Sequence, residues 1–336
     1  MMLNASGLNS IRSGHRTTLS VYGLSLITAT ALTFLCTHSS WSQTADGGKE
    51  AVSGEATISI DASGSPIVIK TTDRLAGAID SLTWNGKEFV DSFDHGRQIQ
   101  SAATFDAALP GEFWPERFNP TEAGSRRDGV GPTSTSRLLE FRADASTLSS
   151  KTQMAFWLAP GEKSFGRPAI NDTKLSEHLH AKTITLGKYN SPHLIDFEIT
   201  FTIPAGEQHR LAQFEALTGY MPPEFSRFLA IERNTGRLLE LSEGPGEQPL
   251  PVILSTPSGS HAMGVFSPDQ PSVGFEQAGY GRFLFKQEQV VKWNCVFRVR
   301  DDENITPGDY RYQVIVVVGD LETVKRELAS IAAPRS

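Results

Sequence analysis

The sequence predicts an all-β protein, a large antiparallel β-sandwich (supersandwich) with one short C-terminal helix. From about residue 56 the chain consists of short runs rich in Val, Ile, Thr, Phe and Trp, separated by Gly, Pro, Asn and Asp. Such runs are typical of strands, and many strands at short spacing favour a sandwich. The best helical signal comes late, over 320–332, where apolar residues recur at a spacing of three or four.

The first 42 residues predict a secretory signal peptide. They carry Arg12 and Arg16, no acidic residue, an apolar stretch over 19–36 and small residues up to Ser42. A basic start, an apolar middle and small residues at the expected cut form the pattern of an exported chain. We therefore expect a secreted or periplasmic protein with no membrane span after cleavage. Residues 43–55 are polar and small and predict a flexible lead-in.

Charge and cysteine content exclude several classes of protein. The chain has 336 residues and a formal charge of −7, and loss of the two arginines of the signal leaves −9. An acidic protein does not bind nucleic acid by bulk electrostatics. Cleavage leaves Cys295 as the one cysteine, in an apolar run that predicts a buried thiol. The sequence lacks nucleotide-binding, serine-hydrolase and zinc-peptidase motifs, and we expect no cofactor.

The expected strands follow one another along a single domain that we place at 56–333. Their ranges are 56–60, 66–70, 79–84, 152–158, 181–186, 194–203, 228–232, 251–254, 262–266, 281–285, 289–298 and 310–318. Asn85-Gly86 predicts a tight hairpin, because both residues accept positive φ angles. In 196–202 large apolar residues alternate with polar ones, which predicts a strand with one buried face. Residues 105–137 predict a long loop, and a loop of that length is usually functional or disordered.

A first polar cluster, over 91–101, contains His95, Arg97 and Gln98. In an extended segment His95 and Arg97 point the same way, and both can donate hydrogen bonds to sugar hydroxyls or to a carboxylate. The alternative is an ordinary strand end at the surface.

A second cluster lies in the long loop, where Trp114 precedes Asn119, Glu122 and Arg126. An aromatic ring face beside amides, carboxylates and forked donors is what a sugar cleft requires. The alternative is a solvated loop whose aromatic residues pack into the core, since such a loop would contain the same residue types.

Two further segments offer groups for acid–base chemistry. His178 and His180 fall on one face of an expected strand, a spacing that can serve proton transfer or sugar contact. The same spacing could bind metal if a distant residue such as His95 supplied a third ligand, but we assign no metal. Glu215 is a candidate general base and Tyr220 a candidate acid or stacking ring. Plain structural roles are the alternative for all four.

The segment Gly77–Phe89 resembles the first hairpin of the galactose mutarotase-like β-supersandwich superfamily, through its Ile-Asp-Ser-Leu and Asn-Gly elements. The closing run 310–319 with its short helix is also similar. The resemblance covers the fold pattern of most of the mature chain and names no member. It implies a carbohydrate site on a concave sheet face. Epimerases of the superfamily use a His and a Glu on the anomeric oxygens, and related lyases use Tyr and His.

These observations predict an exported, carbohydrate-active protein that acts on a sugar or polysaccharide by acid–base chemistry, as an epimerase or a lyase does. His95, His178, His180 and Glu215 would supply the chemistry. The binding residues would be Arg97, Gln98, Trp114, Asn119, Glu122, Arg126 and Tyr220. The first alternative is a non-catalytic glycan-binding module of the cell envelope, and the second is a structural envelope protein with no ligand.

Overall fold

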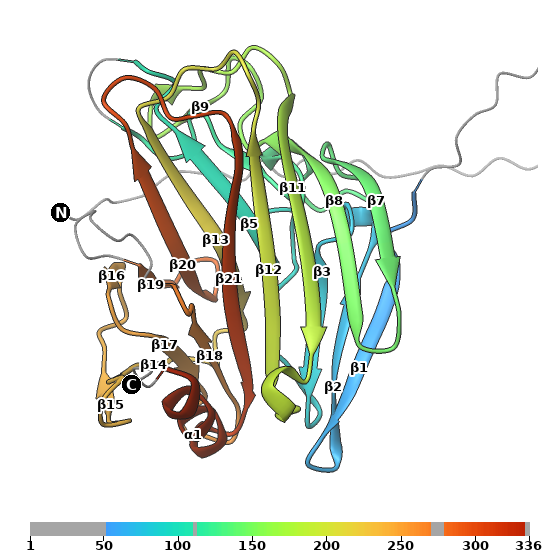
Figure 1. Ribbon diagram of the computed structural model, residues 1–336, viewed down its shortest axis with the longest axis vertical. Helices are drawn as coiled ribbons and strands as arrows, with labels where there is room; N and C mark the ends of the chain where they lie inside the picture. The colour runs from blue at the N-terminus through green and yellow to red at the C-terminus, as the bar shows by residue number, and fades with distance from the viewer. Residues whose placement is uncertain (1–51, 110–112, 270–278, 333–336) are drawn as a thin grey trace, which may run out of the picture. The chain divides into compact units, whose positions relative to one another are not determined.

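The computed structural model describes residues 52–109, 113–269 and 279–332, and the described residues belong to one compact unit. The expected signal peptide, 1–42, lies outside them. Nineteen strands join in one sheet, two short strands form a second, and every pairing among the described strands is antiparallel. The structure confirms the predicted all-β sandwich with a single C-terminal helix (Figure 1). No helix of the described residues is both long and apolar enough to cross a bilayer.

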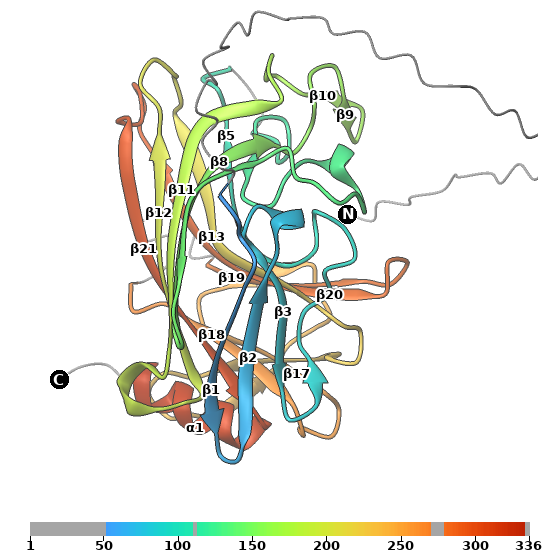
Figure 2. The same cartoon turned by 90° about the vertical axis from the view of Figure 1, so that its right-hand side faces the viewer.

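The large sheet folds over on itself into two layers, which Figure 2 shows nearly edge-on. In order of pairing, the first layer contains β16 (Gly246–Gln248), β19 (Tyr280–Phe285), β20 (Val290–Arg300), β13 (Leu211–Met221), β5 (Ile99–Phe105), β3 (Ile79–Trp84), β2 (Ser65–Thr71) and β1 (Ala56–Ala62). The second contains β7 (Arg137–Ala143), β8 (Thr147–Phe156), β11 (Leu175–Leu186), β12 (Leu194–Ile203), β21 (Gly308–Gly319), β18 (Ala262–Phe266), β17 (Val252–Ser255), β14 (Arg227–Ile231) and β15 (Leu238–Glu240). The short β6 (Pro120–Thr121) pairs with both β5 and β8 and joins the layers.

The remaining elements are small. β4 (Lys87–Glu88) pairs with β3, and β9 (Lys163–Ser164) pairs with β10 (Arg167–Pro168). Single 3-10 turns occupy Asp73–Leu75, Arg126–Asp128 and Lys188–Asn190. The β3–β4 turn confirms the predicted hairpin, because Asn85 and Gly86 have φ angles of 48° and 74°.

The main core lies between the two layers and follows from the alternation of the strands. On β12 the side chains of Phe197, Ile199 and Phe201 are buried in this core, whereas Glu198 points outward. Cys295 is buried there too, as predicted, and burial raises the pKa of its thiol. The sandwich is therefore stabilised by apolar burial without a disulfide among the described residues.

Helix α1 (Leu321–Ala332) covers the outer face of the second layer beside β18, β21 and β14. Asp320 caps it, since its carboxylate accepts a hydrogen bond from the backbone N–H of Thr323 at 2.7 Å. Leu328 packs so closely on β18 that a Cβ at Gly264 would lie 2.5 Å from it. β21 is apolar on both faces because Val316 points into the main core and Val317 toward the helix.

Candidate functional site

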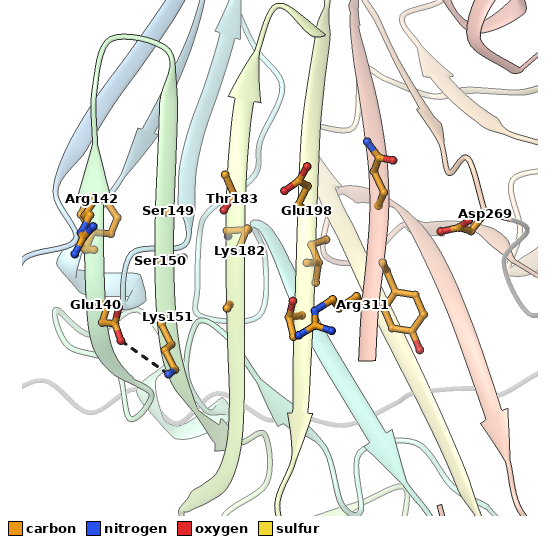
Figure 3. Close-up of a pocket in the computed structure, with 16 residues that line it drawn as sticks. Glu140, Arg142, Ser149, Ser150, Lys151, Lys182, Thr183, Glu198, Asp269 and Arg311 are labelled. Atoms are coloured by element: carbon orange, nitrogen blue, oxygen red, sulfur yellow. Dashed lines mark ion pairs between the residues drawn. The ribbon is translucent and has the colours of Figure 1, made fainter. Parts of the chain in front are cut away.

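Two hollows formed mainly by strand residues lie on the outer faces of the sandwich, one on each layer. Another, of about 800 Å³, lies beside helix α1. The hollow on the second layer has a volume of about 630 Å³ and crosses β7, β8, β11, β12 and β21 (Figure 3). Its rim carries charges, including Glu140 and Lys151, whose charged atoms lie 3.9 Å apart. Its two aromatic residues, Phe141 and Tyr312, pack against the main core. This surface therefore offers mainly polar groups, and its two rings are partly buried against the core.

The hollow on the first layer combines polar groups with aromatic rings. We call it the β13 hollow, and its volume is about 460 Å³. Its sheet residues are Gln100, Ala102 and Thr104 of β5, Gln213, Glu215, Thr218 and Tyr220 of β13, Glu247 of β16, Phe283 and Phe285 of β19, and Lys292, Asn294 and Arg298 of β20. Its remaining lining residues are Thr121 of β6 and, outside the strands, Gly96, Pro115, Glu116, Asn119 and Trp157. A floor of strand side chains with irregular segments at its edge is a common form of ligand site.

A β-bulge in β13 aligns its polar residues on one face. Between Glu215 and Leu217 the pairing with β20 shifts by one residue, which leaves Ala216 without a partner on that side. Without the shift, Tyr220 would point away from Glu215, because strand side chains alternate. With it, both line the β13 hollow. The bulge therefore assembles the polar part of the site.

Lys292 links the two candidate acid–base groups of the hollow. Its Nζ donates to Glu215 Oε2 at 3.0 Å and lies 5.2 Å from the centre of the Tyr220 ring. Burial lowers the pKa of Lys292, but Glu215 and Tyr220 outweigh this and the net pKa is raised. Burial raises the pKa of Tyr220, with Lys292 opposing it. At neutral pH the site therefore holds an ammonium group and a protonated phenol.

A second ion pair lies further along β20, where Arg298 is opposite Gln213 of β13. Arg298 contacts the Glu247 carboxylate at 2.8 Å and donates through Nε to Gln213 at 3.0 Å. With Glu116 and Glu215, the lining includes three carboxylates against two cations, a net charge of −1. Both cations already face a carboxylate.

Three aromatic rings form a row along the hollow. Tyr220 and Phe285 have ring centres 6.3 Å apart and planes 20° apart. Phe285 and Phe283 follow at 6.1 Å and 7°. Trp157 lines the edge, where a Cβ at Gly96 would lie 2.8 Å from its indole, so only glycine permits this approach. Parallel ring faces of this kind bind the apolar face of a ring-shaped ligand.

Three of the predicted site residues line this hollow: Glu215, Tyr220 and Asn119. The Asn119 amide donates to Thr104 Oγ1 at 3.0 Å and also to the backbone of β5. These two bonds hold the segment that precedes β6 against β5. Glu215 and Tyr220 share β13, and Asn119 reaches them from another part of the chain because it is hydrogen-bonded to β5, the neighbour of β13.

The predicted site residues of the first polar cluster lie elsewhere, although Gly96 and Gln100 of that cluster line the hollow. His95 is fully buried, and its two ring nitrogens each lie 2.8 Å from a backbone carbonyl oxygen, of Arg74 and of Gly129. Gln98 is also buried and donates to the carbonyl of His95 at 2.8 Å. Arg97 pairs with Asp94 at 3.4 Å. The structure therefore gives His95 and Gln98 contacts within the protein and places neither in the hollow.

Two residues of the second cluster lie on other surfaces. Trp114 lines a smaller hollow of about 270 Å³, where the guanidinium of Arg167 lies 4.3 Å from its ring centre. Arg126 lies 3.5 Å from the carboxylate of Glu162 and donates to the carbonyl of Lys163 at 3.2 Å. Neither is among the residues that line the β13 hollow.

Glu122 and His180 are buried in the interior with Lys182. The Lys182 ammonium donates to the Glu122 carboxylate, and neither side chain is exposed. His180 Nδ1 lies 3.9 Å from the same carboxylate, and burial lowers the pKa of His180 to about 4. Burial raises the pKa of Glu122, but Lys182 and His180 outweigh it and the net pKa is lowered. The structure therefore places this group away from solvent.

His178 belongs to a different group, with the buried His209 and the partly exposed Glu207. The Nε2 atoms of both histidines lie 2.7 Å from the same oxygen of Glu207. Burial raises the pKa of Glu207, but hydrogen bonds from the two histidines lower it to about 2. Burial lowers the pKa of His178, although the hydrogen bond to Glu207 and the negative charge of Glu207 act to raise it. His178 and His180 are thus on one face of β11, as predicted, but have different partners.

Several residues of the hollow were missed in the sequence, although a signal was present. On β20, Lys292, Asn294 and Arg298 alternate with the buried Trp293 and Cys295, which marks a strand with one polar face. On β19 two phenylalanines alternate in the same way. Polar side chains at alternate positions of an otherwise apolar strand indicate a solvated face. The alternating phenylalanines of β19 indicate that aromatic rings share this face.

Comparisons with known proteins show remote structural likeness. No protein-family model matches the chain, and no curated protein matches it. Among solved structures, the Slr1438 protein from Synechocystis sp. PCC 6803 is 11% identical, with 79% of this chain and 96% of that chain covered and a TM-score of 0.43. The alpha-galactosidase from Lactobacillus brevis is 9% identical, with coverage of 84% and 42% and a TM-score of 0.41. GH36 alpha-galactosidase AgaA from Geobacillus stearothermophilus is also 9% identical, with coverage of 79% and 41% and a TM-score of 0.39. This chain spans less than half the length of either galactosidase.

Proposed function

We propose that this protein is an exported carbohydrate-active protein that binds a neutral sugar in the β13 hollow and interconverts its anomers by acid–base chemistry. The observation that carries the proposal is the row of ring faces beside the Glu215–Lys292–Tyr220 group. A sugar ring has an apolar face that packs on aromatic rings and a rim of hydroxyls that needs paired donors and acceptors. The hollow offers both within a volume suited to a small ligand.

The charge of the hollow favours a neutral sugar over a uronic acid. A lyase must bind the carboxylate of a uronate beside groups that neutralise it, because an uncompensated buried charge is costly. The hollow has a net charge of −1, and both of its cations already face carboxylates. An epimerase-like reaction on a neutral sugar therefore fits these residues better than elimination from a polyuronate.

Glu215 and Tyr220 can serve as base and acid in such a reaction. The Glu215 carboxylate takes the proton of the anomeric hydroxyl while the Tyr220 hydroxyl gives its proton to the ring oxygen. The bond from C1 to the ring oxygen breaks, C1 becomes an aldehyde, and closure on its other face returns both protons. Lys292, in contact with Glu215 and Tyr220, stabilises the phenolate formed on the way. No histidine lines the hollow, so Tyr220 takes the role that the superfamily resemblance gives to a histidine.

A binding-only module is the second candidate, and the Glu215–Lys292 ion pair favours it. The Glu215 carboxylate already accepts a hydrogen bond from the Lys292 ammonium at 3.0 Å, so it has a partner within the protein before any sugar binds. In this case the same contacts would hold a sugar without turnover. The two candidates share the site and differ only in catalysis.

One comparison separates them. Anomerically pure neutral hexoses are incubated with the purified protein, and binding is followed by calorimetry and anomer exchange by NMR. Catalysis predicts that Glu215→Gln slows exchange by ~10²–10⁴-fold, the usual contribution of a general base. Phe283→Ala should weaken binding by about three- to tenfold, through the loss of a stacking contact. Glu198→Gln, on the other outer face, is the matched control and should change neither.

The outcomes are distinct. Binding that is weakened by Phe283→Ala, without exchange above the uncatalysed rate, would support the binding module. Failure to bind any neutral hexose, or binding unaffected by Phe283→Ala and Glu215→Gln, would contradict the site itself. Export rests on the sequence alone. N-terminal sequencing of the protein recovered from the periplasm or medium tests it, with Gln43 expected as the first residue.

A further inference from the structure

We propose that His178, Glu207 and His209 form a binding site for a divalent transition metal, with Zn²⁺ as the best-matched ion. His178 lies on β11, and the other two residues lie in the connection from β12 to β13. Within the described part of the chain, this is the one group of three or more possible ligands whose donor atoms converge. The site is separate from the β13 hollow.

The geometry of the three side chains requires little change to hold an ion. Their donor atoms all lie within 4.8 Å of one another, and the Nε2 atoms of His178 and His209 each lie 2.7 Å from the same oxygen of Glu207. Zn²⁺ binds histidine nitrogen and carboxylate oxygen at ~2.0–2.2 Å, so donors around it are roughly 3.3 Å apart. Each of the two nitrogen–oxygen distances would therefore have to lengthen by roughly 0.6 Å to admit the ion.

The surroundings fix the two rings before any ion binds. Phe105 packs against both imidazoles, with ring centres 4.6 Å from His178 and 4.5 Å from His209. Phe118 borders the same group. Rings held by packing lose little freedom when they take up a ligand, which favours binding.

Exposure differs among the three residues in a way that suits metal entry. The side chains of His178 and His209 are 3% and 2% exposed, whereas that of Glu207 is 25% exposed. The carboxylate side therefore opens to solvent, where an ion can enter and water can complete the coordination. Two imidazoles and one carboxylate with an open position match Zn²⁺ and exclude Ca²⁺ and Mg²⁺, which prefer oxygen ligands.

A bound ion would fasten the β12–β13 connection to β11. Phe105 ends β5, and the preceding Thr104 lines the β13 hollow from the other face of that strand. The metal is thus expected to stabilise the fold next to the hollow without touching a sugar in it. This inference does not depend on the proposed function, and its test uses metal binding alone.

The experiment is a Co²⁺ titration of the chelator-treated protein, because four-coordinate Co²⁺ absorbs visible light strongly. We expect one equivalent of Co²⁺ to give this band, Zn²⁺ to displace it, and Zn²⁺ to raise the melting temperature. Glu207→Gln keeps the shape but removes the anionic ligand, and His209→Ala removes a nitrogen ligand. Removing only a hydrogen-bond partner of a metal ligand weakens metal binding by ~10–100-fold. Each of these two substitutions removes a ligand itself and should weaken Co²⁺ binding by more than that. His261→Ala removes a histidine outside the group and should leave binding unchanged.

Two results would overturn the proposal. One is the absence of both the Co²⁺ band and a Zn²⁺-dependent rise in melting temperature for the unaltered protein. The other is Co²⁺ binding that Glu207→Gln leaves at full affinity. Because Glu207→Gln is nearly isosteric, this second result remains decisive even if His209→Ala fails to fold.

Discussion

Replacing Lys182 by Met is expected to lower the free energy of unfolding by about 3–5 kcal/mol. Lys182 and Glu122 are both fully buried, and the ammonium donates directly to the carboxylate. Met has nearly the same length but no charge, so the substitution leaves the buried Glu122 without its counter-charge, and either an unpaired ion or a protonated carboxyl costs free energy. The backbone N–H of Ser101 at 2.9 Å cannot replace a counter-charge. Urea denaturation of the two proteins at neutral pH measures the difference.

Two further variants isolate the cause of that loss. Lys151→Met removes a lysine from the neighbouring strand, where it faces Glu140 at 3.9 Å with both side chains exposed, and should cost less than about 1 kcal/mol. The double variant Lys182→Met with Glu122→Met removes both buried charges and should recover most of the stability, because no unpaired ion remains. A Lys182→Met protein as stable as Lys151→Met would show that the pair is not buried in solution.

Replacing Trp293 by Ala is expected to cost about 3–5 kcal/mol, the range for deleting a buried aromatic side chain. Trp293 is fully buried and is the largest such side chain among the described residues. Its indole packs so closely on β13 that a Cβ at Gly219 would lie 2.5 Å from it. The neighbours Lys292 and Asn294 line the hollow, so the cavity would open directly beneath the site.

Thermal and urea unfolding of Trp293→Ala measure this loss, and Trp114→Ala serves as the control. Trp114 is only partly buried, so its truncation should be much less costly. Trp293→Phe should fall between, because it keeps most of the ring volume and the indole N–H has no hydrogen-bond partner among the described residues. Equal stability losses for Trp293→Ala and Trp114→Ala would contradict the packing of the two layers described above.

Features that depend on a few adjacent residues could be predicted from the sequence. The Asn85-Gly86 turn depends only on the preference of two residues for positive φ, and the helix over 320–332 depends only on the spacing of its apolar residues. The alternation of β12 was equally local. These predictions are confirmed because nothing distant in the chain competes with them.

The strands that form the hollow were harder to predict. β5 contains Gln-Ser-Ala-Ala-Thr, whose small and polar residues hide the usual apolar alternation, and it was read as part of a polar cluster and a loop. In β13 the bulge at Ala216 breaks the period of two, and strict alternation would place Glu215 and Tyr220 on opposite faces.

Convergence in space was the other missing information. Asn119, Glu215 and Lys292 become neighbours only through the pairing of β5, β13 and β20, which no local pattern encodes. The histidines illustrate the opposite error. His95 and His178 were predicted as site residues because a histidine can transfer protons. The burial of a side chain and its hydrogen-bond partners decide whether it can contact a ligand, and residue type does not reveal them.

The most direct test of the account is a crystal structure of the protein soaked with the neutral hexose that binds best in solution. The account predicts a sugar ring packed on Phe283 and Phe285, with a hydroxyl within hydrogen-bonding distance of the Glu215 carboxylate. A sugar bound only on the outer face of β7, β8, β11, β12 and β21, or no sugar at saturating concentration, would contradict it.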